Sequence, residues 1–127
     1  MKEIGIKQIS DKDADLAAGL NSLGMNRTTA LTLVGISRTE NAKARDVERL
    51  TGLRQPEVSI GVRELIERGW VTETAVKKNA GKGRPTKIYT LTVPFDAILT
   101  AIAAEKDAEA KKALDNITKL RRLAAAK

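Results

Sequence analysis

The 127-residue sequence contains neither cysteine nor histidine. Without cysteine, disulfides, thiolate metal sites and thiol redox sensing are excluded. Without histidine, the usual zinc sites and a histidine general base are excluded as well. Catalysis by carboxylates or lysine stays open, but no pair of such residues stands out among the solvated charges. We therefore expect a protein that is not an enzyme and that uses no cofactor and no metal.

Aromatic residues and long apolar runs are also scarce. Aromatic residues make up only 2% of the chain, so its core must be built from Leu, Ile, Val and Ala. No apolar run approaches the length of a membrane span, and no signal-peptide pattern opens the sequence. These features predict a cytoplasmic protein without a membrane partner, of a size that supports a modest core.

Positive charge is abundant and unevenly placed. The formal net charge is +7, but a basic total by itself says little about nucleic acid. Residues 54–68 balance three arginines against three glutamates, whereas residues 70–93 set five cations against Glu73 alone. Those five are Lys77, Lys78, Lys82, Arg84 and Lys87. Their concentration in one loop favours a segment that contacts phosphates.

Residues 53–70 carry the clearest helical pattern. Pro56 falls in the first turn, where its missing N–H removes no helical bond, and Gly69 follows the last turn. Helical spacing predicts one buried face, made of Val58, Val62, Leu65 and Ile66. The same spacing predicts an open face with Gln55, Ser59, Ile60 and Arg63.

A shorter helical pattern over residues 44–50 precedes this helix and ends at Thr51-Gly52. Two short helices joined by a glycine-containing turn are typical of a helix-turn-helix. Upstream, two more helices are predicted, one from about residue 11 to Leu23 and one after the capping residue Asn26. Downstream, residues 70–76 and 87–93 are β-prone runs on either side of the basic loop.

The last segment, from Phe95 to about Ala125, is predicted to be one long helix of roughly 45 Å. Pro94 separates it from the preceding strand. Its interrupted apolar stripe is longer than a small domain can cover, so we expect a partner to bury Ile98, Leu99, Ile102, Leu114, Ile117 and Leu120.

Over residues 16–93 the chain resembles the winged helix-turn-helix transcription regulators of the MarR and TrmB kind. The segments that carry the resemblance are residues 23–30, 44–53, 55–59, 65–71 and 83–89. The resemblance implies a mainly α fold with a small β-hairpin, in which residues 11–93 form the DNA-binding domain. It also implies that residues 94–127 form a helix that dimerises the chain.

The resemblance implies two sets of DNA contacts, one from the recognition helix in the major groove and one from the wing. The candidate residues are Arg54, Gln55, Pro56, Ser59, Ile60, Arg63, Lys77, Lys78, Lys82, Arg84 and Lys87. Ile60 could touch a thymine methyl or could pack at the edge of the core. The stretch Lys82-Gly83-Arg84-Pro85 is similar to the core of an AT-hook, with Lys in place of the first Arg, but could also be an ordinary basic loop.

These observations predict a homodimeric, sequence-specific regulator of transcription that binds double-stranded DNA. Two alternatives stay open at this stage. The first is a protein-interaction module that uses the same winged domain against protein. The second is a sequence-neutral chromatin or replication-associated DNA binder. The sequence identifies no small-molecule effector and no target gene.

Overall fold

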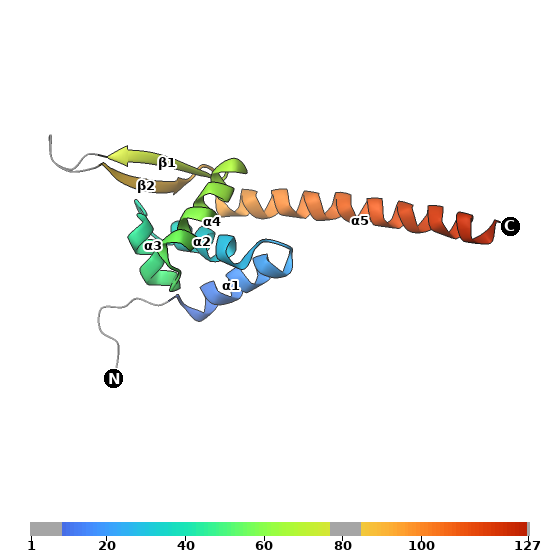
Figure 1. Ribbon diagram of the computed structural model, residues 1–127, viewed down its shortest axis with the longest axis horizontal. Coiled ribbons are helices and arrows are strands. Elements are labelled where there is room, and N and C mark those ends of the chain that lie inside the picture. Colours follow the sequence, from blue (N-terminus) through green and yellow to red (C-terminus); the bar gives the residue numbers. More distant parts are fainter. Residues whose placement is uncertain (1–8, 77–84, 127) are drawn as a thin grey trace. The chain divides into compact units, whose positions relative to one another are not determined.

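The computed structural model describes residues 9–76 and 85–126. The chain divides into two compact units, Met1–Val93 and Pro94–Lys127. The elements of the first unit are α1 (Asp11–Ser22), α2 (Arg27–Ser37), α3 (Ala44–Thr51), α4 (Gln55–Glu67), β1 (Val71–Val76) and β2 (Thr86–Leu91). The second unit contains α5 (Phe95–Ala125), and Figure 1 shows all of these elements. The predicted fold class, mainly α with one β-hairpin and a long last helix, is confirmed.

Helix α2 is the centre of the first unit. Every residue from Thr29 to Ile36 is buried, and α1, α3, α4 and β2 all contact this helix. A helix whose residues are buried on every side must have other elements packed around it. The side-chain oxygen of Asn26, the residue before α2, accepts a hydrogen bond from the Thr28 N–H at 3.0 Å, as the sequence predicts.

The contact between α2 and α4 depends on Gly61. A Cβ atom at this position would lie 2.5 Å from the Thr32 Oγ1 and 2.9 Å from the Thr32 Cβ. One turn away, the Thr29 hydroxyl donates a hydrogen bond of 2.6 Å to the Glu64 carboxylate. The close approach and this hydrogen bond together fix how α4 lies on α2, and therefore which face of α4 is open.

The exposure of α4 agrees with the sequence prediction except at one residue. Val58, Val62 and Leu65 are buried, but Ile66 is 37% exposed, so the prediction for Ile66 was wrong. Gly61 is also buried and extends the buried face away from Ile66, since at 3.6 residues per turn the two positions lie roughly 140° apart around the helix.

The two strands form an antiparallel hairpin, the wing, with a register from Val71↔Leu91 to Val76↔Thr86. Both strands are offset from the predicted runs, since Trp70 precedes β1 and Val93 follows β2. Trp70 instead connects α4 to the wing: the Arg68 guanidinium lies 4.2 Å from the centre of its ring. The Trp70 carbonyl also accepts a hydrogen bond from the Thr92 N–H at 2.9 Å.

Helix α5 of the second unit has 31 residues, as the composition predicted. Ile98 and Ile102 are buried. Four large apolar side chains nearer its end are exposed, namely Leu114, Ile117, Leu120 and Leu123. Among the described residues, no helix has the length and apolar character needed to cross a membrane.

Candidate nucleic-acid interface

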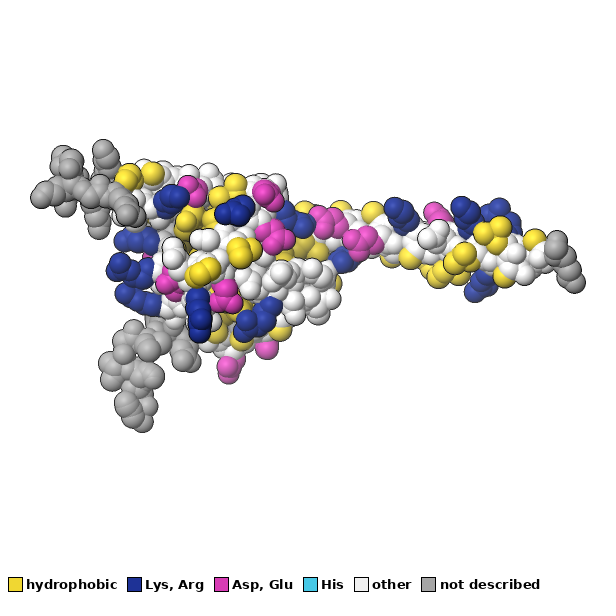
Figure 2. Space-filling view, in the orientation of Figure 1, with side chains coloured by type: hydrophobic (Ala, Val, Ile, Leu, Met, Phe, Trp, Pro, Cys, Tyr) yellow, Lys and Arg dark blue, Asp and Glu magenta, His cyan; other side chains and the backbone are white. Residues whose placement is uncertain are grey.

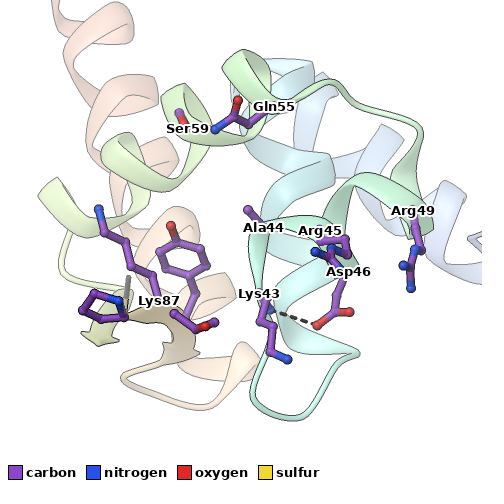
Figure 3. Close-up of a pocket in the computed structure, with 11 residues that line it drawn as sticks. Lys43, Ala44, Arg45, Asp46, Arg49, Gln55, Ser59 and Lys87 are labelled. Carbon is purple, nitrogen blue, oxygen red and sulfur yellow. Dashed lines mark hydrogen bonds between the residues drawn. The ribbon is translucent and has the colours of Figure 1, made fainter. Parts of the chain in front are cut away.

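The first unit has an open groove of about 650 Å³ between the starts of α3 and α4 and the strand β2 (Figure 3). Three segments that are separate in the sequence therefore meet at one surface. The residues that line the groove are Lys43, Ala44, Arg45, Asp46, Arg49, Gln55, Ser59, Pro85, Thr86, Lys87 and Tyr89. Four of these side chains are cationic and one is a carboxylate, so the groove is suited to a polyanion.

Three of the four cations belong to α3 and to the residue before it, which the sequence analysis did not identify. Arg45 and Arg49 are four residues apart, so they lie on the same side of the helix, and both are exposed. Lys43 immediately precedes this helix. Figure 2 shows Lys and Arg side chains gathered over the α3 side of the first unit. The spacing of Arg45 and Arg49 was visible in the sequence, but its meaning depends on the fold, which places both residues beside α4.

The N-cap residues of α3 and α4 are also cationic, which is unusual. The Lys43 N–H donates to the Asp46 carboxylate at 3.0 Å, and the Arg54 N–H donates to the Glu57 carboxylate at 2.8 Å. The side chains of Lys43 and Arg54 make no capping hydrogen bond. A positive charge at this end of a helix is unfavourable against the helix dipole, whereas an anion is favourable there. Each helix therefore begins with an unfavourable positive charge, which an approaching anion would stabilise.

The open face of α4 contributes Gln55 and Ser59 to the groove, and both side chains are exposed. Neither Ile60, which is 58% exposed, nor Arg63 lines the groove, although both lie on the open face. Arg54 and Pro56 are exposed beside it. The prediction that this face of α4 is open is confirmed, while the role of each residue in binding stays a prediction.

The wing contributes Lys87 and Tyr89 to the same groove. The Lys87 ammonium lies 3.7 Å from the Glu73 carboxylate on β1, and the Lys87 side chain keeps 60% of its surface exposed. Burial raises the pKa of the Tyr89 phenol, and the nearby Glu73 carboxylate raises it further. The other four wing candidates, Lys77, Lys78, Lys82 and Arg84, lie outside the described residues.

Tandem helices followed by a hairpin, with α4 exposed beside a basic groove, define a winged helix-turn-helix domain. Residues 23–82 match the family model of the MarR family. The resemblance found in the sequence is thereby confirmed, and it supports a DNA-binding regulator of transcription in general.

Solved structures with the same fold agree with this match. One is a MarR family transcription regulator that is 21% identical, with a TM-score of 0.53 over 90% of this chain and 73% of that one. Another, a transcriptional regulator, is 25% identical, with a TM-score of 0.53 over 87% of this chain and 86% of that one. No curated protein matches the sequence.

Proposed function

We propose that the protein is a sequence-specific transcription regulator that binds double-stranded DNA, with the start of α4 in the major groove. The observation that carries this proposal is the meeting of Gln55 and Ser59 with four cations in one groove. Glutamine can form paired hydrogen bonds with adenine, and serine can bond to a base edge or a phosphate. The cations supply the contacts to phosphates that position a protein on the duplex.

The three basic segments divide the backbone contacts between them. Lys43, Arg45 and Arg49 lie on the α3 side of α4, and Lys87 lies on the wing side. A duplex that receives α4 in its major groove presents a sugar–phosphate backbone on each side of that helix. The cations of α3 would therefore contact one backbone, and the wing would contact the other. Lys77, Lys78, Lys82 and Arg84 extend the wing set on the basis of the sequence alone.

The protein is proposed to act as a homodimer through α5. Its exposed apolar residues recur every three residues from Leu114 to Leu123, whereas Lys111, Lys112, Lys119 and Arg122 lie on the opposite side of the helix. A second copy of the helix would cover this stripe. In a two-fold dimer the two α4 helices would occupy successive half-sites on the DNA. Leu99 and the buried Ile98 and Ile102 were also predicted to serve the dimer, and that role stays a prediction.

The proposal is tested by selecting bound sequences from a pool of random duplex DNA. A sequence-specific regulator should enrich one motif, and a dimer should enrich two inverted copies of it about one helical turn apart. Enrichment of no motif, with equal affinity for all duplexes, would favour a sequence-neutral DNA binder. If no duplex is retained even at low salt, the interaction module becomes the better account.

A further inference from the structure

Tyr89 lies where the wing meets the segment before α3. Its N–H donates a hydrogen bond of 2.8 Å to the carbonyl of Ala42, which is fully buried and precedes the N-cap residue Lys43. On its other side, Tyr89 pairs with Glu73 of β1. The backbone of Tyr89 is therefore held by two neighbouring segments, which fixes the position from which its side chain extends.

The hydroxyl group of Tyr89 opens onto the basic groove. The residue is only 9% exposed, yet it lines the groove together with Lys43, Arg49 and Lys87. No hydrogen bond joins this hydroxyl to any residue that the structure describes. Within that part of the chain every buried side-chain oxygen has a partner, so the Tyr89 oxygen itself must reach the surface. Packing alone would be satisfied by phenylalanine, and the hydroxyl is left for another partner.

The chemistry of the surroundings identifies that partner as an anion. A phenol is a neutral donor, and burial followed by the Glu73 carboxylate raises the Tyr89 pKa, so the O–H proton is retained. A phosphate oxygen accepts such a hydrogen bond strongly, because hydrogen bonds to charged groups are shorter and stronger than neutral ones. The cations on both sides of the hydroxyl would bring a phosphate to this position.

We propose that the Tyr89 hydroxyl donates a hydrogen bond to one phosphate of the DNA backbone and so sets the position of the duplex between α3 and the wing. This inference rests on the proposed DNA-binding function. Tyr89 would be a positioning residue, because it reads no base and adds no charge. Its backbone pairing with Ala42 and with β1 distinguishes it from the long, flexible lysine and arginine side chains around it.

The first test compares Tyr89→Phe with the matched wing variant Lys87→Gln in the full-length protein. Tyr89→Phe should weaken binding about tenfold on every duplex and leave the salt dependence unchanged, because no charge is removed. Lys87→Gln should instead make the slope of log K against log salt shallower by about one per subunit. Equal affinity of Tyr89→Phe and the unaltered protein, with unaltered thermal unfolding, would overturn the inference.

The second test replaces single phosphates of the selected DNA site by neutral methylphosphonates. At the phosphate that Tyr89 contacts, the replacement should weaken binding of the unaltered protein. The same replacement should cost the Tyr89→Phe protein much less, because this variant has already lost the hydrogen bond. The two changes should therefore be strongly non-additive at that phosphate alone. Additive losses at every phosphate would contradict the proposal. Failure of the unaltered protein to bind DNA would instead contradict the proposed function itself, so the two failures are distinguishable.

A third measurement covers the case in which Tyr89→Phe folds poorly. Tyr89 is the only tyrosine in the chain, so isotope-labelled tyrosine gives a single Cζ resonance in the unaltered protein. A new hydrogen bond to phosphate should shift this resonance on binding of the selected duplex. A resonance that stays in place when the duplex is saturated would overturn the inference without any substitution.

Discussion

Lysine at position 43 and arginine at position 54 stand where a helix prefers serine, threonine, aspartate or asparagine. The N3 carboxylates of Asp46 and Glu57 occupy the backbone N–H groups of these N-cap residues, so half of a capping box is present in each helix. The other half, a side-chain oxygen at the N-cap, is missing in both. The two helix ends that border the basic groove are therefore less stable than they would be with an ordinary N-cap residue. Such a loss of stability is expected where a charged ligand binds.

The first prediction concerns the cationic N-cap residue of α3. Lys43→Ser supplies the missing cap and removes a cation from the positive end of α3, so the free energy of unfolding should rise by about 1 kcal/mol. The same change should weaken DNA binding and make the salt slope shallower by about one per subunit. Denaturant unfolding and DNA titration measure the two effects.

Lys12→Gln serves as the control, because it removes a lysine from the exposed side of α1, outside the groove lining. It should leave the salt slope unchanged. A Lys43→Ser protein that binds DNA as well as the unaltered one would show that the α3 N-cap is not part of the interface.

The second prediction concerns Gly61, where the neighbouring helix leaves no room for a side chain. Gly61→Ala would place a Cβ atom 2.5 Å from the Thr32 hydroxyl oxygen, so α4 must shift on α2. Overpacking of this kind should lower the free energy of unfolding by about 1–3 kcal/mol, which exceeds the gain of about 1 kcal/mol that alanine normally brings to a helix.

The matched control is Gly19→Ala in α1, where nothing lies within 4 Å of the added atom. That change should stabilise the protein by up to about 1 kcal/mol. If Gly61→Ala also stabilises the protein in thermal unfolding, the close approach of α2 and α4 is not what fixes the open face of α4.

The helices and the hairpin could be predicted from the sequence, because caps, periodicity and breakers act locally. Asn26, Pro56 and Gly69 are found at the ends where their backbone chemistry places them. The groove could not be predicted in the same way. Its three segments, residues 43–49, 55–59 and 85–89, meet only through the packing around α2, which local patterns do not specify. Ile66 was misplaced for a related reason, since helical spacing alone does not show that Gly61 belongs to the buried face and extends it away from Ile66.

The third prediction distinguishes the residues that contact phosphates from the residues that contact bases. Replacing Arg45 and Arg49 by Gln should weaken binding to all duplexes alike and make the salt slope shallower by up to about two per subunit. Replacing Gln55 and Ser59 by Ala should leave that slope unchanged and relax the sequence preference, at about 1–3 kcal/mol of discrimination for a paired base contact.

Each of these double variants is the control for the other, because all four side chains line the same groove. Binding of matched and mismatched duplexes across a salt series measures both properties. A loss of sequence preference in the arginine variant, with none in the Gln55 and Ser59 variant, would reverse the assignment of α3 and α4.

Helix α5 carries an exposed apolar stripe near its end, which we propose a partner covers. The side chains of Leu114, Ile117, Leu120 and Leu123 are each between 46% and 63% exposed. On an isolated helix such a stripe is an association surface, and the basic residues on the other side of α5 keep that side in water. A second copy of the chain is the simplest such partner, because it requires no other protein.

The fourth prediction is that Ile117→Asp together with Leu120→Asp converts a dimer into a monomer, because two charges cannot be buried in an apolar interface. Sedimentation velocity at micromolar concentration measures this change. Replacing Lys112 and Lys119 on the opposite side by Gln should leave the dimer intact. An unaltered protein that sediments as a monomer would remove the proposed dimer.

We propose that the groove and α4 bind duplex DNA, with charge supplying affinity and α4 supplying selectivity. The most direct measurement is the affinity for the selected site and for a scrambled duplex of equal length, across a series of salt concentrations. We expect a steep fall of log K with log salt, about −0.9 for each phosphate contact, and tighter binding to the selected site throughout. Salt-independent binding, or equal affinity for both duplexes at every salt concentration, would contradict it.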